Sequence, residues 1–424
     1  MTLMRVKQDQ LALRLAGMVL PVGLDAARAA ALARLQAMGM PGKRDEYWRY
    51  TDPTSLSATG VPLAAAFDDS DEAPVFGAVD RLKLVFVDGV FDAQASDDPT
   101  LAGVEISRLA EAGAGHWSEG LYGSLEAAGQ IPVSRPLAAL NSAFATEGVL
   151  IRVTGLTTRP VSLIYIHKSE RSDAMLHHFV KLEPGASLTL LENGPAAARL
   201  NAVLEVDLGE GAAFHHVRAQ GRDHARRAVT HVFARLAAQA AFKSFTVTAN
   251  GVLTRNEVVL DIKGDDAKAH VAGAALGDGD FLHDDTVFVT HDALRCESRQ
   301  VFKKVLKNGA VGVFQGKILV KKGAQKTDGY QISQALLLDE DSQFLAKPEL
   351  EIYADDVKCS HGSTSGAIDE TALFYLRSRG VALRQAQALL VLAFLAEAIG
   401  EIDDEAIAED IRSRLEGWLA RHDH

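Results

Sequence analysis

Apolar residues follow two kinds of spacing along this chain of 424 residues. Near the N-terminus, between residues 24 and 38, they recur every three or four positions, which predicts an amphipathic helix. From about residue 82 to residue 353 they form short β-rich runs separated by turns. Helical spacing returns after residue 367. The pattern therefore predicts a long β region between two helical ends.

The β region consists of short apolar runs that Gly, Asp and Asn residues separate. Many runs are apolar at consecutive positions, which suits strands that are covered on both faces and stacked in coils. No repeat motif is visible, so the pattern favours a β-helix without excluding a sandwich or a barrel. One short helix is expected at residues 136–145. The expected strands lie at residues 82–87, 149–153, 162–167, 187–191, 202–206, 242–247, 257–262, 286–290, 316–320 and 350–353.

Three helices are expected at the C-terminal end. Asp369 is a good N-cap for a helix over residues 370–379, which Gly380 ends. Residues 382–399 are apolar almost all round, which predicts a helix buried between its neighbours. The last helix is expected to start after Asp404 and to present one apolar stripe, formed by Ile407, Ile411, Leu415, Trp418 and Leu419.

These patterns divide the chain into four parts. We expect an N-terminal helical domain at residues 1–52, a linker at 53–81, a β core at 82–366 and a C-terminal helical domain at 367–424. The linker carries a cluster of acidic residues and is expected to lie in solvent. These acidic residues are Asp68, Asp69, Asp71 and Glu72.

Composition and charge argue against several functional classes. With 56 acidic and 44 basic residues the net charge is −12, which argues against a nucleic-acid binder, although a local basic patch is not excluded. The two cysteines, Cys296 and Cys359, are too few for a disulfide framework or for the four thiolates of an ordinary iron–sulfur cluster. Charged residues interrupt the N-terminal apolar stretch, and the longest apolar run, at 388–396, is about half of a membrane span. We therefore expect a soluble cytoplasmic protein that does not bind membranes.

Common catalytic motifs are incomplete in this chain. The segment 312–318 resembles a phosphate-binding loop, but its glycines are one residue too close, and Ile318 replaces the Ser or Thr that would bind magnesium. The segment 362–366 has the glycines of a nucleophile elbow, but Thr364 replaces its central serine.

The histidines are scattered along the chain. The adjacent pairs at 177–178 and 215–216 would face opposite sides of a strand, so surface positions are expected for them. A group of acids and histidines around residues 283–291 is interpreted as hydrogen-bonded turn residues rather than as a site. It comprises His283, Asp284, Asp285 and His291.

The densest polar group lies at residues 355–362. Cys359 and His361 are two positions apart, so on an extended segment their side chains point the same way. Thiolate and imidazole both bind zinc or iron, but this pair provides at most two ligands. From the residues alone, a buried cysteine beside a surface histidine is the default interpretation.

The same segment resembles a known family. Residues 347–362, continuing through 369–380, are similar to the C-terminal signature of the SufB/SufD family. Within this family the chain resembles the SufD branch, because SufB chains are richer in cysteine and carry Glu where this chain has Gly362. Further similar blocks extend the resemblance over nearly the whole chain, at residues 44–51, 140–143, 255–257, 312–320, 324–328 and 336–338.

The resemblance implies a right-handed parallel β-helix flanked by N- and C-terminal helical domains. It also implies a non-catalytic scaffold subunit for iron–sulfur cluster assembly, which pairs with SufB and binds the ATPase SufC through its C-terminal helices. ATP binding by SufC would then twist the SufB–SufD pair and open the interface to iron and sulfide. No cofactor is expected to stay bound to the isolated chain. Iron or a nascent cluster would bind transiently at the SufB interface, and an isolated chain could form a homodimer through the same edge.

The resemblance also carries roles onto individual residues. His361 matches the family histidine of the SufB–SufD interface site, and Cys359 fills the neighbouring position as a secondary candidate ligand. The residues expected to contact partners are Asp355, Asp356 and Lys358 on the SufB side and Asp369, Phe374, Tyr375, Arg377 and Arg379 on the SufC side.

Two alternative functions are also considered. A SufB-like scaffold would have more cysteines and a Glu at position 362. A β-helix carbohydrate-active enzyme would use paired carboxylates, for which the candidates are Asp284 with Asp285 and Asp355 with Asp356. Such enzymes are usually exported and carry stacked aromatic residues, whereas aromatic residues make up only 6% of this chain.

Overall fold

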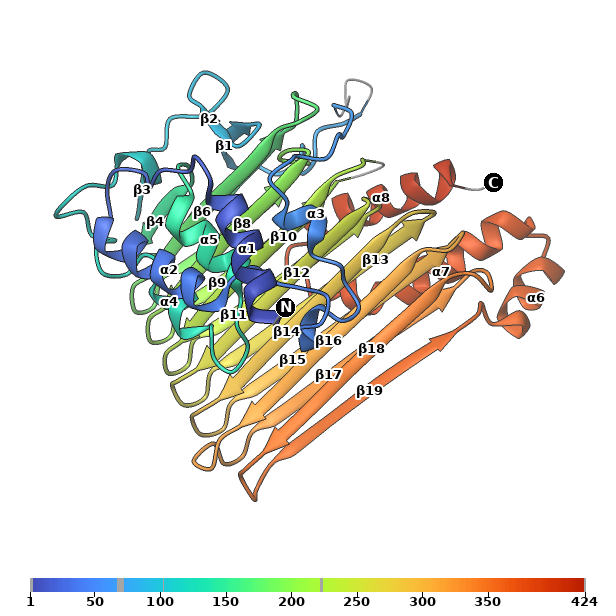
Figure 1. Ribbon diagram of the computed structural model, residues 1–424. Helices are drawn as coiled ribbons and strands as arrows, with labels where there is room; N and C mark the ends of the chain where they lie inside the picture. Colours follow the sequence, from blue (N-terminus) through green and yellow to red (C-terminus); the bar gives the residue numbers. More distant parts are fainter. Residues whose placement is uncertain (1–2, 67–71, 102, 222–223, 423–424) are drawn as a thin grey trace.

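Two parallel sheets lie face to face at the centre of the computed structural model, which describes residues 3–66, 72–101, 103–221 and 224–422. From the fourth strand onwards, successive strands alternate between the sheets, so each coil of the chain adds one strand to each sheet (Figure 1). This arrangement is a parallel β-solenoid, which confirms the fold class and removes the sandwich and the barrel as alternatives.

The strands of the solenoid have the following order. Sheet A consists of β19 (Lys358–Gly366), β17 (Asp328–Leu337), β15 (Glu297–Lys307), β13 (Lys268–Asp278), β11 (Ala241–Ala249), β9 (Ala213–Gln220), β7 (Ser187–Asn193), β5 (Val161–Ile166), β1 (Leu82–Val87) and β2 (Val90–Asp92). Sheet B consists of β18 (Gln343–Ile352), β16 (Val311–Val320), β14 (Leu282–His291), β12 (Leu253–Ile262), β10 (Arg227–Leu236), β8 (Arg199–Leu208), β6 (Asp173–Leu182), β4 (Val149–Val153) and β3 (Val104–Arg108). The described pairs are parallel except β1 with β2 and β3 with β4.

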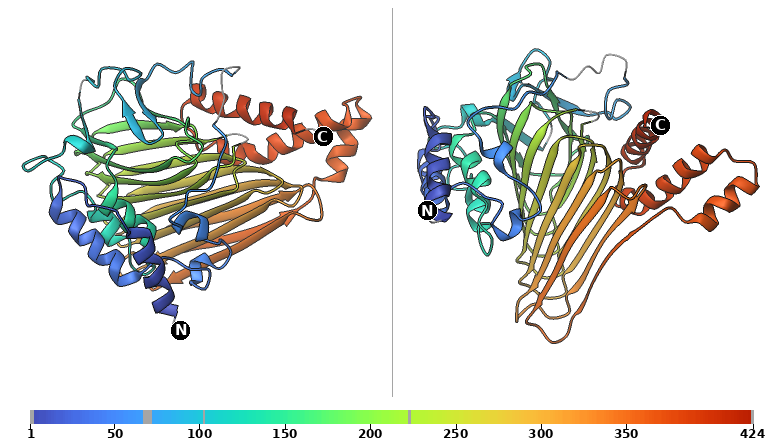
Figure 2. Two further views of the ribbon diagram at one scale, coloured as in Figure 1. Left: turned by 45° about the horizontal axis from the view of Figure 1, so that its top comes forward. Right: turned by 45° about the vertical axis from the view of Figure 1, so that its right-hand side comes forward.

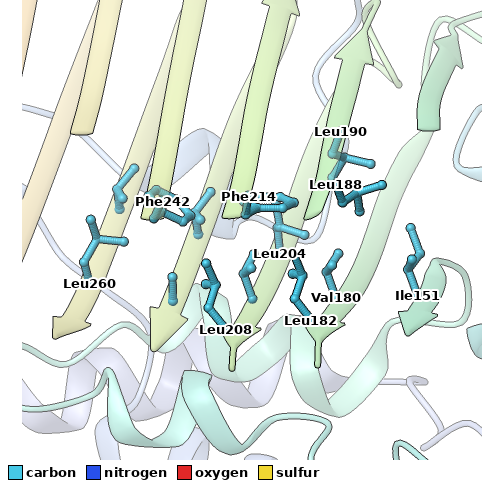
Figure 3. Packing of buried hydrophobic residues seen from close by; sticks show 14 of the residues in the cluster. Ile151, Val180, Leu182, Leu188, Leu190, Leu204, Leu208, Phe214, Phe242 and Leu260 are labelled. Carbon is cyan, nitrogen blue, oxygen red and sulfur yellow. The ribbon is translucent and has the colours of Figure 1, made fainter. Parts of the chain in front are cut away.

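Aliphatic side chains from successive coils stack on one another between the two sheets. Side chains alternate across a strand, so every second residue of a strand points into this interior. Helices and loops cover much of the outer faces, and for that reason many strands are apolar at consecutive positions. Figure 3 shows part of the interior, with labels on Ile151, Val180, Leu182, Leu188, Leu190, Leu204, Leu208, Phe214, Phe242 and Leu260.

A left-handed backbone conformation recurs at the turns that lead from sheet B to sheet A. It reverses the chain within a few residues, and Gly adopts it without steric cost. The turns also bond to each other from coil to coil, as in the 2.8 Å hydrogen bond from the Gln239 N–H to the Asp265 carbonyl. The residue type at this left-handed position changes from coil to coil, which explains why no repeat motif is visible in the sequence. In chain order the residues at this position are Gly185, Gly211, Gln239, Asp266, Arg295 and Lys326.

Helices cover the outer face of sheet B. The short α4 (Ser124–Ala128) and α5 (Pro136–Phe144) pack on β6, β8 and β10, and α2 (Asp25–Met38) packs on α5, next to α1 (Leu3–Leu15) (Figure 2). The helices predicted at 24–38 and 136–145 are therefore confirmed.

The segment between the N-terminal helices and β1 is partly packed. It contains α3 (Thr54–Ser57), which contacts β10, and Phe76, which is fully buried. Of the four acidic residues that were expected to lie in solvent, Asp68, Asp69 and Asp71 are outside the described residues, and Glu72 is half-buried.

The C-terminal helices lie on the opposite side of the solenoid (Figure 2). They are α6 (Glu370–Ser378), α7 (Leu383–Ile399) and α8 (Glu405–Arg421), and α7 packs on β13 and β15 of sheet A. The predicted apolar stripe of α8 faces the core: Ile407, Ile411, Leu415 and Trp418 are buried, and Leu419 is half-buried. The prediction that α7 is buried all round is wrong, because α7 leaves the sheet towards α6 and its Leu383 and Leu389 are 42% and 45% exposed. Within the described residues, no helix is both long and apolar enough to cross a membrane.

Three of the four adjacent histidines are buried, which corrects the expectation of surface positions. His178 points between the sheets, where its Nε2 lies 3.1 Å from the Tyr165 hydroxyl. His177 points outward, but helices cover that face, and its Nε2 lies 3.0 Å from a Glu205 carboxylate oxygen. His216 is buried as well, whereas His215 is half-buried. Both faces of these strands are covered, so alternation does not bring either histidine of the first pair to the surface.

The acid–histidine group at 283–291 lies within β14 rather than in a turn, and this prediction was also wrong. All four side chains are buried, and they pair with other charged or polar groups. Asp284 contacts the Arg255 guanidinium, and Asp285 lies 2.6 Å from the Lys304 amine. These polar residues break the apolar pattern of the strand without ending it.

Candidate functional site

The last coil of the solenoid, which we call the end coil, consists of β18, the turn at 353–357 and β19. In the described structure β18 pairs only with β16, and β19 pairs only with β17, so both strands stand at the ends of their sheets (Figure 1). The free edge of such a strand presents backbone N–H and C=O groups that can pair with another chain.

β19 places Cys359 and His361 on the face that points into the interior in earlier coils. Their register partners on β17 are Gly329 and Gln331, which are both buried. His361 is exposed because no described coil follows to cover it, whereas Cys359 is half-buried. The two side chains therefore share a face, as their spacing indicated, and their role as metal ligands stays a prediction.

Cys359 leans back towards the core. A Cβ atom at Gly329 would lie only 3.2 Å from its sulfur, and the side chain packs at the edge of a small apolar cluster with Ile318 and Val320. Burial raises the pKa of Cys359, although a hydrogen bond from the Gly329 backbone partly offsets this effect. A metal would have to displace the thiol proton, so the exposed His361 is the better placed ligand of the two.

Exposed charged residues surround this pair. Asp355 and Asp356 lie on the turn that leads into β19, and Lys358 opens the strand. A 2.9 Å hydrogen bond from the Asp356 backbone N–H to the side-chain oxygen Oε1 of Gln325 fixes the turn. Among the described residues, no group of three His, Cys, Asp or Glu side chains is arranged to hold a metal ion. A metal bound by His361 would therefore need ligands from outside this part of the chain.

The N-terminal block at 44–51 reaches the outer face of the end coil through η1 (Glu46–Trp48). The Lys347 amine on β18 lies 2.7 Å from a Glu46 carboxylate oxygen and 4.1 Å from the centre of the Tyr47 ring. Trp48 lies 4.2 Å below the Arg255 guanidinium. Spacing along the chain carries no signal for this contact, because Glu46 and Lys347 are 301 positions apart.

At the other end of the β19 segment, α6 projects from the sheets (Figure 2). The Asp369 carboxylate caps the helix, as predicted, by accepting hydrogen bonds from the N–H groups of Thr371 and Ala372 at 2.8 and 3.0 Å. Phe374 and Tyr375 are 74% and 57% exposed. Clustered apolar surface of this kind is typical of interaction sites. The neighbouring cations Arg377 and Arg379 are also exposed.

The junction between α7 and α8 is anchored to sheet A by charged contacts. The Glu401 carboxylate lies 3.0 Å from His270 Nδ1 and accepts a 2.9 Å hydrogen bond from Arg299. The contact with His270 lowers the pKa of Glu401, which keeps the carboxylate charged. Lys303 pairs with Glu397 at 2.7 Å. One end of the C-terminal helices is thus held firmly, while α6 stays accessible.

Comparisons with known proteins agree with this geometry. A family model for the SufBD core domain of SUF-system iron–sulfur cluster assembly matches residues 165–394, which include the end coil and α6. The chain is 27% identical over 393 residues to the iron–sulfur cluster assembly protein SufD of Escherichia coli, covering 91% of this chain and 90% of that protein. It is 28% identical over 291 residues to SufD of Bacillus subtilis, covering 66% of each. A SufBD family protein of Synechocystis is 26% identical over 388 residues, covering 87% of this chain and 85% of the relative.

These findings confirm the resemblance that the sequence motifs indicated, including its SufD branch. They support a role in the SUF pathway of iron–sulfur cluster assembly. On the extent of the family match and of the similarity to its relatives, the chain belongs to the SufB/SufD family of iron–sulfur cluster assembly proteins.

Proposed function

We propose that this chain is a non-catalytic scaffold subunit of a cytoplasmic iron–sulfur assembly complex, which pairs with a SufB-like subunit through its end coil. The observation that carries the proposal is the exposed His361 on a strand with a free edge. Natural proteins usually protect such edges, and a second β-helix placed against β18 and β19 would cover both edges at once. When no SufB-like subunit is present, a second copy of this chain would pair through the same surface.

Iron, and later a nascent cluster, is the cargo of this interface. Neutral imidazole is a good ligand for iron, and His361 would supply it, with Cys359 as a secondary ligand. The SufB-like subunit would contribute the remaining ligands. Asp355, Asp356 and Lys358 border the same edge and would contact that subunit.

A SufC-like ATPase would bind to α6 and the exposed part of α7. The support for this assignment is the aromatic surface of α6 formed by Phe374 and Tyr375, with Arg377 and Arg379 beside it. Asp369 would act by capping this helix. Because α7 is also anchored to sheet A, movement of the bound ATPase would be transmitted to the solenoid.

No observation favours a carbohydrate-active enzyme. Such enzymes need two carboxylates that are free to act on a substrate. Asp284 and Asp285 are buried and paired with Arg255 and Lys304.

The proposal is tested by reconstitution. The chain is co-expressed with a SufB-like subunit and a SufC-like ATPase, and cluster formation by the purified complex is measured by absorbance after anaerobic addition of iron and sulfide. We expect His361→Ala to lower the cluster yield while the complex stays intact. Ser360→Ala is the matched control, because Ser360 is exposed on the opposite face of the same strand. Unchanged yield from His361→Ala in an intact complex would overturn the role of His361, and a chain that binds neither partner would overturn the scaffold.

A further inference from the structure

The interior behind His361 is polar. One inner row of sheet A runs through His361 on β19, Gln331 on β17 and Gln300 on β15, which are register partners in turn. Both glutamines are fully buried. Neighbouring parallel strands lie about 4.8 Å apart, so Gln331 is the direct neighbour of His361 in this inner row.

The two glutamines satisfy each other only in part. Gln331 Nε2 donates a 2.7 Å hydrogen bond to Gln300 Oε1. Gln331 Oε1 has no hydrogen-bond partner among the described residues, and neither does Gln300 Nε2. A fully buried polar atom without a hydrogen-bond partner destabilises the folded state by about 1–3 kcal/mol. A hydrogen-bond donor to Gln331 Oε1 would therefore be stabilising.

The absence of a side chain at Gly316 leaves space for the Gln331 carboxamide. Gly316 lies on β16 in the opposite sheet, and a Cβ atom there would be 2.2 Å from Gln331 Nε2 and 2.8 Å from Gln331 Oε1. The segment 312–318, which resembles a phosphate-binding loop, therefore has a packing role at this position: its second glycine makes room for Gln331. Residues of both sheets therefore determine the position of the carboxamide: Gln300 of sheet A by a hydrogen bond and Gly316 of sheet B by the space it leaves.

Other inner residues near His361 do not offer a comparable acceptor. Ser333 and Ser363, in the next inner row, are hydrogen-bonded to each other at 3.2 Å. Cys359 leans over Gly329, away from the free edge. None of the described residues is hydrogen-bonded to the His361 ring, so a donor on the ring and an acceptor on Gln331 are both available at paired positions of adjacent strands.

We propose that Gln331 is a positioning residue for His361: its carboxamide oxygen accepts the N–H of one imidazole nitrogen and leaves the lone pair of the other nitrogen facing the free edge. A histidine that binds a metal usually donates its other N–H to an oxygen acceptor, which fixes both the tautomer and the ring orientation. Gln300 holds the Gln331 carboxamide in turn. The inference rests on the proposed function only for the identity of the metal cargo, which is iron.

The tautomer of His361 tests this inference in the full-length chain without any partner. The imidazole nitrogens are labelled with ¹⁵N, the His361 signals are assigned by their loss in His361→Ala, and the tautomer is read from their chemical shifts at pH 8. We expect one dominant tautomer in the unmodified chain and a mixture in Gln331→Met, which keeps the volume but removes the acceptor. Gln331→Glu retains an oxygen acceptor and should restore the single tautomer.

The control is Ser333→Ala, which changes the next inner row of the same strand and should leave the tautomer unchanged. Fe²⁺ titration of the reconstituted complex, under anaerobic conditions, should show 10–100-fold weaker binding for Gln331→Met, the range found when such supporting groups are removed. Equal tautomer populations in the unmodified chain and Gln331→Met would overturn the inference. If the tautomer depends on Gln331 but His361→Ala leaves the cluster yield unchanged, the proposed function fails while the positioning role stands.

Discussion

The hydroxyl of Tyr47 donates a hydrogen bond to the Glu349 carboxylate on β18, 302 positions further along the chain. Tyr47 is buried, and its ring packs edge-on against Phe288 with centroids 5.1 Å apart. Burial, and then the contact with Glu349, raise the pKa of Tyr47, so the hydroxyl keeps its proton and acts as a donor. The N-terminal segment thus supports the last strand of sheet B, on whose free side the proposed partner would bind.

Removal of this hydroxyl should loosen the end coil. Tyr47→Phe keeps the ring but deletes the hydrogen bond, which we expect to destabilise β18 locally by about 1 kcal/mol. Hydrogen exchange in peptides that cover residues 343–352 should then be roughly fivefold faster. Tyr375→Phe, on the exposed face of α6, is the control and should leave this exchange unchanged. Exchange in Tyr47→Phe at the rate of the unmodified chain would contradict the supporting role.

The exposed aromatic surface of α6 gives a prediction about the ATPase. Phe374→Asp changes a side chain that is 74% exposed, so we expect the free energy of unfolding to change by no more than about 0.5 kcal/mol. Binding of a SufC-like ATPase, measured by calorimetry, should weaken at least about tenfold, as for aromatic residues that dominate an interface. The matched control is Leu13→Asp, which alters a 65% exposed residue of α1 on the other side of the molecule. Equal loss of binding in both variants would mean that the α6 surface is not the ATPase site.

The sequence predicted the strands whose inward and outward positions are both apolar. The runs at 82–87 and 149–153 agree with β1 and β4 in their bounds. Strands such as β15 were missed, because Gln300 and Lys304 occupy inward positions that a simple apolar pattern reserves for aliphatic residues. Lys304 is tolerated there because it pairs with Asp285 on the opposite sheet. A pattern of single residues does not reveal such pairs.

Prediction of the candidate site was similarly partial. The two-residue spacing of Cys359 and His361 indicated their shared face correctly, because alternation within one strand is a local property. Gln331 and Tyr47 were not identified. Their contacts depend on how coils stack and on how the N-terminal segment folds back, and neither follows from local spacing when no repeat is visible.

The packing of Gln331 over Gly316 can be tested by stability. Gly316→Ala places a methyl group where the Gln331 carboxamide lies, so we expect a loss of about 1–3 kcal/mol in the free energy of unfolding, as for other overpacked interiors. The double variant Gly316→Ala with Gln331→Ala should recover part of this loss. Gly323→Ala is the control, since a Cβ atom at Gly323 meets no atom within 4 Å. Similar unfolding midpoints in urea for Gly316→Ala and Gly323→Ala would show that Gly316 is not needed for this packing.

Buried neutral histidines should make the solenoid sensitive to mild acid. Burial lowers the pKa of His178, His231 and His291 to about 4, whereas an unfolded histidine titrates near 6.5. Between these values the unfolded chain binds protons that the native chain does not, so stability present above pH 6.5 is lost as the pH falls towards 4. Each fully buried histidine would contribute a loss of up to about 1.4 kcal/mol per pH unit in this window.

Urea unfolding at pH 7, 6 and 5 measures this dependence. The midpoint should fall steadily, and His231→Leu, which removes one titrating group, should make the fall shallower. Carboxylates with lowered pKa values, such as Glu257 at about 2, begin to lose their stabilising contribution as the pH falls through the unfolded value of about 4.3, which is below the pH 7 to 5 range of this measurement. The effect of the histidines can therefore be separated from ordinary acid denaturation. A midpoint that is the same at pH 7 and pH 5 would show that these histidines are protonated in the folded chain.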